Sequence, residues 1–247
     1  ARADIVFLCL PGTEAVRETL FGAKGIAAMM GASQIIVDTS TMDYLETREF
    51  SEKLDERGIG FIDAPVSGME ARAIEGTLTA MCGGKAETLE KVRPYLSCIA
   101  NNILHMGDSG SGQLSKLINQ LLFDINCAAI AEVLPMAAKL GIDPEKIGKI
   151  INSGTGRSYA SEFFIPRILK NNFSDGYPLQ HAYKDIDAGA KVSATHNIPM
   201  PVLAAASATY QMALLKGHGH LDKGAMIRVF EDLLGVQFRS RGDDVAG

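Results

Sequence analysis

Residues 4–12 read DIVFLCLPG, a short apolar run that ends in a Pro-Gly turn. Such a run is typical of a parallel strand that is covered on both faces of its sheet. Thr13 can cap the helix that the next residues, EAVRETLF, predict by their spacing. This first strand-and-helix unit indicates the fold class, because the same pattern returns further along the chain.

The unit repeats through the first half of the chain. QIIVD at residues 34–38 predicts a second strand, and residues 44–57 predict a charged amphipathic helix that ends at Gly58. GFIDAP predicts a third strand, followed by a Gly-rich loop, a helix over residues 85–100 and a short last strand at NILHMG. Strands that alternate with helices predict an α/β fold with a doubly wound parallel sheet.

The second half shows no strand pattern. Residues 111–140 form a nearly unbroken helical pattern, which is unusually long for a globular protein. Further helices are predicted at residues 143–152, 160–170, 178–195, 200–216 and 222–234. We therefore expect a sheet domain over residues 1–109 and an all-helical domain over residues 110–247, with the long helix as the interdomain helix.

The composition argues against several functional classes. The 24 Lys and Arg against 29 Asp and Glu give a net charge of −5 without a basic patch, so nucleic acid is not an expected partner. No apolar run approaches the length of a membrane span, so no membrane partner is expected. The four cysteines form no CxxC pair, which favours a reducing, cytoplasmic location. The five histidines do not cluster at metal-ligand spacing, and no metal is expected.

One segment suited to chemistry is DAPVSGM at residues 63–69. It follows a predicted strand, at the edge of the sheet where open α/β folds bind their ligands. Its small residues let backbone N–H groups approach an anion closely, and Ser67 adds a hydroxyl donor. An ordinary turn rich in Gly and Ser is the alternative interpretation.

A second segment opens the long helix. Lys116, Asn119 and Gln120 share one face of it, as does Gln113 one turn earlier, because residues three and four apart on a helix are neighbours. A lysine flanked by amide side chains is suited to acid/base chemistry, since partial burial favours its neutral amine; a solvated helix face is the alternative. The third segment is HAYKD at residues 181–185, in which one of the adjacent Lys184 and Asp185 is a candidate to face a ligand while the other holds a loop. A pair of solvent-exposed surface residues is the alternative interpretation.

Taken together, these segments resemble the β-hydroxyacid dehydrogenase family, which includes 3-hydroxyisobutyrate dehydrogenases, tartronate semialdehyde reductases and, more distantly, 6-phosphogluconate dehydrogenases. The matching motifs stand in collinear order over essentially the whole chain: D-x-V-x-x-x-L-P, VDTST, DAPVSG, GTL, MCGG, GxGxxxKxxN, AEVLPMAAKLGID and HAYKDID. Motifs in this order are far more specific than any one alone. The resemblance implies a Rossmann-type NAD(P)-binding domain, followed by a helical substrate and dimerisation domain.

The resemblance also implies roles for individual residues. Lys116 is expected to exchange a proton with the substrate hydroxyl while NAD or NADP takes up the hydride. The expected substrate-binding residues are Ser67, Gly68 and Asn119, and the expected cofactor-binding residues are Leu10, Pro11, Thr41 and Lys184. The implied substrate is a short β-hydroxy acid of the 3-hydroxyisobutyrate, tartronate semialdehyde/glycerate or 2-(hydroxymethyl)glutarate type, and the implied assembly is a homodimer or homotetramer.

The sequence also departs from the family pattern. Met69 stands where the family usually has a second Gly, and Gln120 where it usually has a second Asn, so the pocket is expected to differ. The segment SGTGRSY at residues 153–159 resembles the 2-(hydroxymethyl)glutarate branch, in which Arg157 would meet a second carboxylate. The family's opening GxGxMG turn and the residue that sorts NAD from NADP have no counterpart, and we expect roughly two βαβ units before Ala1 that the sequence omits.

Two other functions remain open at this point. A sheet without its first strands would bind dinucleotide poorly, and the chain would then be a non-catalytic truncated remnant whose helical domain acts as an oligomerisation module. An aldehyde or imine reductase of the same scaffold is the other alternative. Lys116 favours the hydroxyacid branch, since imine reductases generally lack a lysine at that place.

Overall fold

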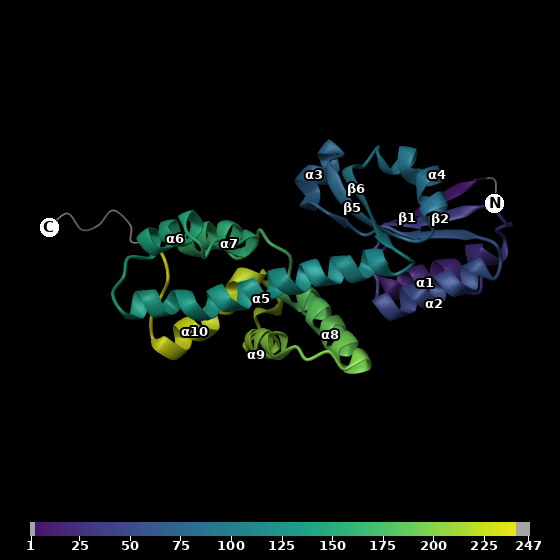
Figure 1. The fold of residues 1–247 in the computed structure, drawn as a ribbon. Coiled ribbons are helices and arrows are strands. Elements are labelled where there is room, and N and C mark those ends of the chain that lie inside the picture. Colours follow the sequence, from purple (N-terminus) through teal and green to yellow (C-terminus); the bar gives the residue numbers. More distant parts are fainter. Residues whose placement is uncertain (1–2, 241–247) are drawn as a thin grey trace. The chain divides into compact units, whose positions relative to one another are not determined.

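The computed structural model describes residues 3–240 of the 247-residue chain. The chain forms two compact units, Ala1–Ile118 (unit 1) and Asn119–Gly247 (unit 2). The long helix α5 (Ser111–Lys139) begins in unit 1 and ends in unit 2 (Figure 1).

Unit 1 contains a sheet whose strands are β1 (Ile5–Leu8), β2 (Ile35–Asp38), β3 (Gly60–Asp63), β4 (Val66–Ser67), β5 (Leu78–Gly83) and β6 (Ala100–Gly107). The strand order is β1-β2-β3-β5-β4, and β6 pairs with β5. The strands β1, β2 and β3 are parallel, which confirms the expected α/β fold. In addition, β5 runs antiparallel to both β3 and β4, and β6 runs parallel to β5.

Two layers of helices cover the parallel strands. Ile36 and its register partner Phe61 pack in the same core as α1 (Thr13–Phe21) and α2 (Tyr44–Asp55), whereas Val37 and Ile62 pack in the core that includes α4 (Ala86–Leu96). Figure 1 shows α1 and α2 on one side of the sheet and α4 on the other. Burial on both faces explains why these strands are continuous apolar runs in the sequence.

The segment between Ala64 and Gly84, where the sequence predicts only a Gly-rich loop, holds three elements. They are β4, α3 (Met69–Glu75) and β5. The β5 sequence, LTAMCG, is rich in small residues and carries little intrinsic strand preference. Its ladder with β6 and its short pairings with β3 and β4 therefore make it a strand, and these partners are distant in sequence.

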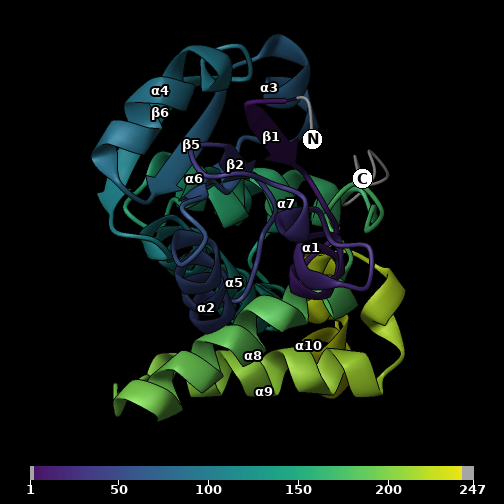
Figure 2. The same cartoon turned by 90° about the vertical axis from the view of Figure 1, so that its right-hand side faces the viewer.

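Unit 2 is helical throughout its described part. Its helices after α5 are α6 (Pro144–Ser153), α7 (Tyr159–Leu169), α8 (Leu179–His196), α9 (Pro201–Leu215) and α10 (Ile227–Leu234). Among residues 3–240 the short 3-10 helices are η1 (Ile26–Ala28), which lies in unit 1, and η2 (His218–His220) and η3 (Lys223–Met226), which lie in unit 2. The helices α8 and α9 lie side by side (Figure 2). These positions agree with the helices that the spacing predicts.

The core of unit 2 forms around one stripe of α5. Leu121, Asp124, Ala128 and Ala131 are buried, and their spacing of three or four residues places them on one side of the helix. The helix α8 approaches α5 closely at Gly189, where a Cβ atom would lie 2.8 Å from both δ carbons of Leu121. The glycine therefore sets how near these two helices can pack.

The boundary between the units falls inside α5, between Ile118 and Asn119. The helical pattern in the sequence places the change earlier, at residues 109 and 110. The difference has a physical cause, because the backbone N–H groups of Gly110 and Gln113 donate to the carboxylate of Asp63 at the end of β3. These bonds make the first turns of α5 part of the sheet unit.

By length and composition α5 could cross a membrane, which corrects the expectation that no apolar run approaches that length. However, 44% of its most apolar window is buried within the described structure. Near its middle, the carboxylate of Asp124 is buried against the ammonium group of Lys223. An apolar helix with a buried ion pair to its own unit is typical of a protein core, and we interpret α5 in this way.

Candidate active site

Lys116 lies in the second turn of α5 and is half-buried. Its Nζ atom donates a hydrogen bond of 3.0 Å to the carbonyl oxygen of Val66 in β4. Ser67 and Gly68 follow Val66 directly along the chain. The fold of unit 1 thus brings together two segments that the sequence analysis singled out and that are 50 residues apart.

Ser67 and Gly68 lie at the junction between β4 and α3. Gly68 has a φ of +143°, and a Cβ atom there would lie 2.8 Å from side-chain carbons of Arg72. Met69 follows with a φ of +60°, in the left-handed region that favours glycine. The position where the family usually has a second Gly is therefore one at which Met69 holds a strained backbone.

Asp63, which the sequence analysis did not select, is a central polar residue of this region. Its side chain is fully buried at the end of β3. Oδ1 accepts a hydrogen bond of 2.7 Å from the N–H of Gly110, and Oδ2 accepts one of 2.9 Å from the N–H of Gln113. Burial raises the pKa of Asp63 to about 6, although these hydrogen bonds oppose the rise. One feature of the sequence could have indicated Asp63, because it is a single acidic residue at the end of an otherwise apolar strand.

Gln113 connects the start of α5 to the loop after β2. The side chain is 1% exposed. Its Nε2 donates to the carbonyl oxygen of Ser40 at 2.7 Å, and its Oε1 accepts from the N–H of Met42 at 2.9 Å. These two bonds bracket Thr41, whose own side chain is exposed. Gln113 thus holds the loop that carries a predicted cofactor residue.

The loops after β1 and β2 are joined by a further contact. The N–H of Leu10 donates to Oγ of Ser40 at 2.8 Å, and the N–H of Ser40 donates to Oδ1 of Asp38 at 2.9 Å. Burial raises the pKa of Asp38 to about 6, while its hydrogen bonds with Ser40 oppose the rise. Leu10 and Thr41 therefore lie in adjoining loops at the carboxyl ends of neighbouring parallel strands. Dinucleotides bind at this edge of an open α/β sheet, so these two loops lie at the edge that is suited to such a cofactor.

Within unit 2, the structure brings the end of the Lys116 motif to the HAYKD segment. Nδ2 of Asn119 donates to Oε1 of Gln120 at 3.2 Å, and Nε2 of Gln120 donates to Oδ2 of Asp185 at 3.3 Å. Lys184 precedes Asp185 on α8 and is exposed. Gln120 therefore links α5 to α8 and places the amide pair next to the Lys-Asp pair.

Arg157 lies just before α7 and is also exposed. Its Nε atom is 3.7 Å from Oε1 of Glu162, with both side chains at least half exposed to solvent. An exposed pair at this distance holds its guanidinium weakly. The group is therefore available for another anion.

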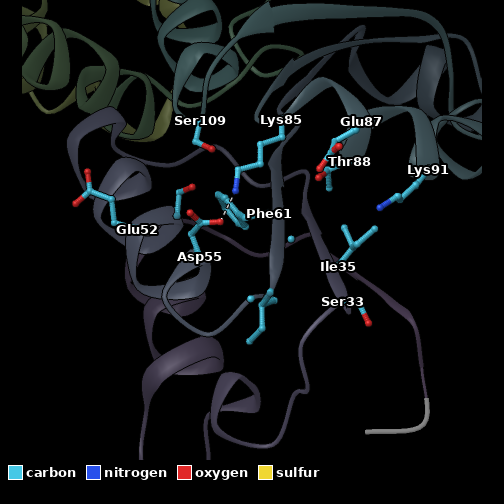
Figure 3. A pocket seen from close by; sticks show the side chains of 14 residues that line it. Ser33, Ile35, Glu52, Asp55, Phe61, Lys85, Glu87, Thr88, Lys91 and Ser109 are labelled. Carbon is cyan, nitrogen blue, oxygen red and sulfur yellow. Dashed lines mark hydrogen bonds and ion pairs between the residues drawn. The ribbon is translucent and has the colours of Figure 1, made fainter.

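A hollow of about 320 Å³ lies elsewhere on unit 1, beside the starts of β2 and β3 (Figure 3). Ile35 and Gly60 are part of its lining, as are Lys85 and Asp55, which form an ion pair of 2.5 Å. None of the predicted site residues lines this hollow.

The comparisons with known proteins agree with this architecture. Residues 1–107 match the family model described as the NAD binding domain of 6-phosphogluconate dehydrogenase. Residues 110–230 match the model described as NAD-binding of NADP-dependent 3-hydroxyisobutyrate dehydrogenase. Together the two models cover the sheet, α5 and nearly all of the described helices after it.

Individual relatives match over almost the whole chain. The 2-(hydroxymethyl)glutarate dehydrogenase of Eubacterium barkeri is 35% identical over 237 residues, which are 96% of this chain and 79% of the relative. The 2-hydroxy-3-oxopropionate reductase of Escherichia coli is 31% identical, over 93% of this chain and 78% of the relative. The structure of Mycobacterium tuberculosis 3-hydroxyisobutyrate dehydrogenase with L-serine is 29% identical, with a TM-score of 0.83 over 92% of this chain and 79% of that one. The chain therefore belongs to the β-hydroxyacid dehydrogenase family of NAD(P)-dependent oxidoreductases.

Proposed function

We propose that Lys116 is the general acid/base for hydride transfer between NAD(P) and a short β-hydroxy acid. One observation carries this assignment: Nζ of Lys116 lies 3.0 Å from the Val66 carbonyl oxygen, immediately before Ser67 and Gly68. An amine in this place lies beside the segment suited to a substrate carboxylate. This position supports the assignment, because a general acid/base must lie within hydrogen-bonding distance of the proton that it transfers.

In the proposed oxidation, the substrate loses one hydride from the carbon that carries the hydroxyl group and one proton from the hydroxyl oxygen. NAD(P), when bound, would supply a hydride acceptor for the carbon that carries the hydroxyl group, and Leu10, Pro11, Thr41 and Lys184 are the residues proposed to hold it. Neutral Lys116 takes the hydroxyl proton as the carbonyl group forms, and in the reverse direction its ammonium form returns that proton. Transfer at this moment relieves the charge that develops on the oxygen in the transition state.

The remaining site assignments follow the family motifs. Ser67 and Gly68 are proposed to hold the substrate carboxylate, and Asn119 to hydrogen-bond the substrate. Leu10, Pro11, Thr41 and Lys184 are proposed for the cofactor. The bracket that Gln113 places around Thr41 and the bond from Leu10 to Ser40 support the assignments in the two loops.

We further propose that the substrate is a dicarboxylic β-hydroxy acid. The similarity to 2-(hydroxymethyl)glutarate dehydrogenase supports this choice, as does the exposed guanidinium of Arg157 with its weak contact to Glu162. Arginine can bind a carboxylate through two parallel hydrogen bonds. Arg157 is therefore proposed to hold the second carboxylate.

A cytoplasmic homo-oligomer is the proposed setting. The four cysteines are free thiols, as is usual in reducing compartments. Three large apolar side chains of α5 remain 52–60% exposed in the single chain, namely Leu122, Val133 and Met136. Exposed apolar surface of this kind supports contact with a second copy.

The test compares two lysines of the same helix. Lys116→Met should lower turnover of 2-(hydroxymethyl)glutarate at least about 100-fold, in line with the loss of a general acid/base. Lys139→Met should leave turnover within about twofold, because Nζ of Lys139 donates to the carbonyl oxygen of Leu234 in unit 2. NAD⁺ and NADP⁺ affinity, measured by fluorescence titration, should be unchanged in both variants.

Each alternative function predicts a different result. Full activity of Lys116→Met would overturn the assignment of the acid/base. A chain that binds neither dinucleotide would support the non-catalytic oligomerisation module, and turnover of imines or simple aldehydes in place of hydroxy acids would support the reductase. Turnover of 3-hydroxyisobutyrate or glycerate without the dicarboxylate would overturn the role of Arg157.

A further inference from the structure

Two short segments of unit 1 are joined at two points to form a closed ring. At the first point, the Asp63 carboxylate accepts the N–H groups of Gly110 and Gln113. At the second point, Nζ of Lys116 donates to the carbonyl oxygen of Val66. Asp63 and Val66 are three residues apart on one segment, and Gln113 and Lys116 are three residues apart on the other. Lys116 therefore contacts the same segment, residues 63–66, that holds the start of its own helix α5.

The Asp63 end of the ring has little room to move. A Cβ atom at Gly83 would lie 2.5 Å from Oδ1 of Asp63, and one at Gly112 would lie 2.8 Å from Oδ2. The Gly112 position is also closed by the carbonyl oxygen of Asp63 itself, at 2.7 Å. Since neither position can accept a side chain without displacement, the carboxylate is held in one place from both sides.

The chemistry of the ring suits an anion. The first N–H groups of an α-helix have no partner within the helix, and the positive end of the helix dipole favours negative charge. Each carboxylate oxygen of Asp63 takes one such N–H group, so both oxygens have a donor. An uncharged amide of the same shape would keep one acceptor oxygen and turn its NH₂ group toward the other N–H.

We propose that Asp63 is a positioning residue that sets the place of Lys116 against β4 by holding the first turn of α5. This inference rests on the proposed role of Lys116 as the acid/base. It predicts that Asp63 acts on turnover through the lysine and does not itself touch the substrate. The Gln113 side chain, which belongs to the same first turn of α5, also joins this turn to Ser40 and Met42 by hydrogen bonds.

The test is Asp63→Asn with Asp222→Asn as its matched control. Asp222 is 1% exposed, and it too gives one oxygen to each of two backbone N–H groups, those of Gly176 and Gly224. Its bonds lie in unit 2, apart from the ring. Both variants should lose similar thermal stability, so any difference in turnover reports the connection to Lys116.

For Asp63→Asn we expect kcat to fall at least about tenfold while KM for the hydroxy acid changes less than about threefold, and the pH profile of kcat should shift. Asp222→Asn should keep kcat within about twofold and the profile of the parent. Should Asp63→Asn not fold, Gly83→Ala takes its place, because its Cβ displaces the same carboxylate. An unchanged kcat in folded Asp63→Asn or folded Gly83→Ala would overturn the proposal, as would a fall of kcat in Asp222→Asn that equals the fall in Asp63→Asn.

A second measurement separates this inference from the proposed function. The rate at which an amine reagent modifies Lys116, followed by peptide mass spectrometry without cofactor, requires no turnover. We expect the rate to rise severalfold in Asp63→Asn and to stay unchanged in Asp222→Asn. If Lys116→Met is fully active but this rate still rises, the proposed function fails and the positioning contact stands. If the rate does not rise, the positioning contact fails.

Discussion

Lys223 and Asp124 form an ion pair at which both side chains are almost completely buried, with 1% and 0% exposed. The hydroxyl of Tyr210 donates to the same Asp124 oxygen at 3.0 Å, and Oδ2 of Asp124 is buried without a hydrogen bond in the described structure. Burial raises the pKa of Asp124 to about 6, although the nearby Lys223 opposes the rise. Together with Tyr210, the pair joins α5, α9 and η3 in the buried interior of unit 2.

Lys223→Met is expected to lower the free energy of unfolding by about 3–5 kcal/mol at pH 7.5, because it leaves a buried carboxylate without its cation. Urea denaturation at constant protein concentration measures this loss. The control is Lys216→Met, whose ion pair with Asp232 at 3.2 Å is exposed and should contribute less than about 1 kcal/mol. Equal losses in the two variants would contradict the prediction.

Gln113→Ala is expected to weaken cofactor binding and to lower the free energy of unfolding by about 2–6 kcal/mol. The variant leaves the Ser40 carbonyl and the Met42 N–H without partners in a buried place, and each unsatisfied group costs about 1–3 kcal/mol. Isothermal titration with NAD⁺ and NADP⁺ measures the affinity. Gln211→Ala removes an exposed amide bond to Tyr183 and should change neither quantity.

Asp38→Asn tests a pH dependence of stability. The folded protein raises the pKa of Asp38 from 3.8 to about 6, so the carboxyl stabilises the fold most when protonated, below pH 3.8, and this contribution is lost as the pH rises through 6. The full change is on the order of 3 kcal/mol. Asn stays neutral, so the stability of the variant relative to the parent should increase from pH 4 to pH 7.

Urea unfolding at several pH values between 4 and 7 measures this relative stability. Asp55→Asn is the control, since its side chain is 62% exposed, and its difference from the parent should not follow the same curve. A constant difference between Asp38→Asn and the parent over this range would show that the folded protein does not raise the pKa.

Met69→Gly is expected to stabilise the protein by about 1 kcal/mol. At a φ of +60° an L-residue with a Cβ atom is strained and glycine is not. Met29 is the control, because it is 64% exposed at a φ of −102°, where glycine should destabilise by about 0.5–1 kcal/mol. Thermal unfolding measures both, and a lower melting temperature in Met69→Gly would argue against strain at this position.

The sequence predicted the local elements well wherever apolar spacing was strong. The parallel strands β1, β2 and β3 are short runs buried on both faces, and the helices from α5 to α10 follow the period of 3.6 residues. It failed at β5, because LTAMCG has no marked preference and becomes a strand by pairing with β6, β3 and β4. The bonds from Asp63 to the start of α5 also have no local signal, because they join residues 47 and 50 positions apart.

The candidate site divides in the same way. Lys116, Ser67 and Gly68 were selected from ordered motifs, each of which is a run of neighbouring residues, and their roles stay predictions. Asp63 and Gln113 were missed as site residues, although both stand inside those motifs, because their importance lies in partners 47 to 73 residues away. A motif shows which residues are present and does not show which backbone groups they satisfy.

The order of apolar runs and the collinear motifs were sufficient to establish the α/β sheet, the helical half and the dehydrogenase family, because side-chain periodicity and motif spacing are local properties of the chain. The tertiary structure alone decided that Lys116 donates to Val66, that Asp63 holds the start of α5 and that Asp124 is buried against Lys223. These contacts join segments that are 47 to 99 residues apart. Burial removes water from such polar groups, and each must then find its partner within the fold.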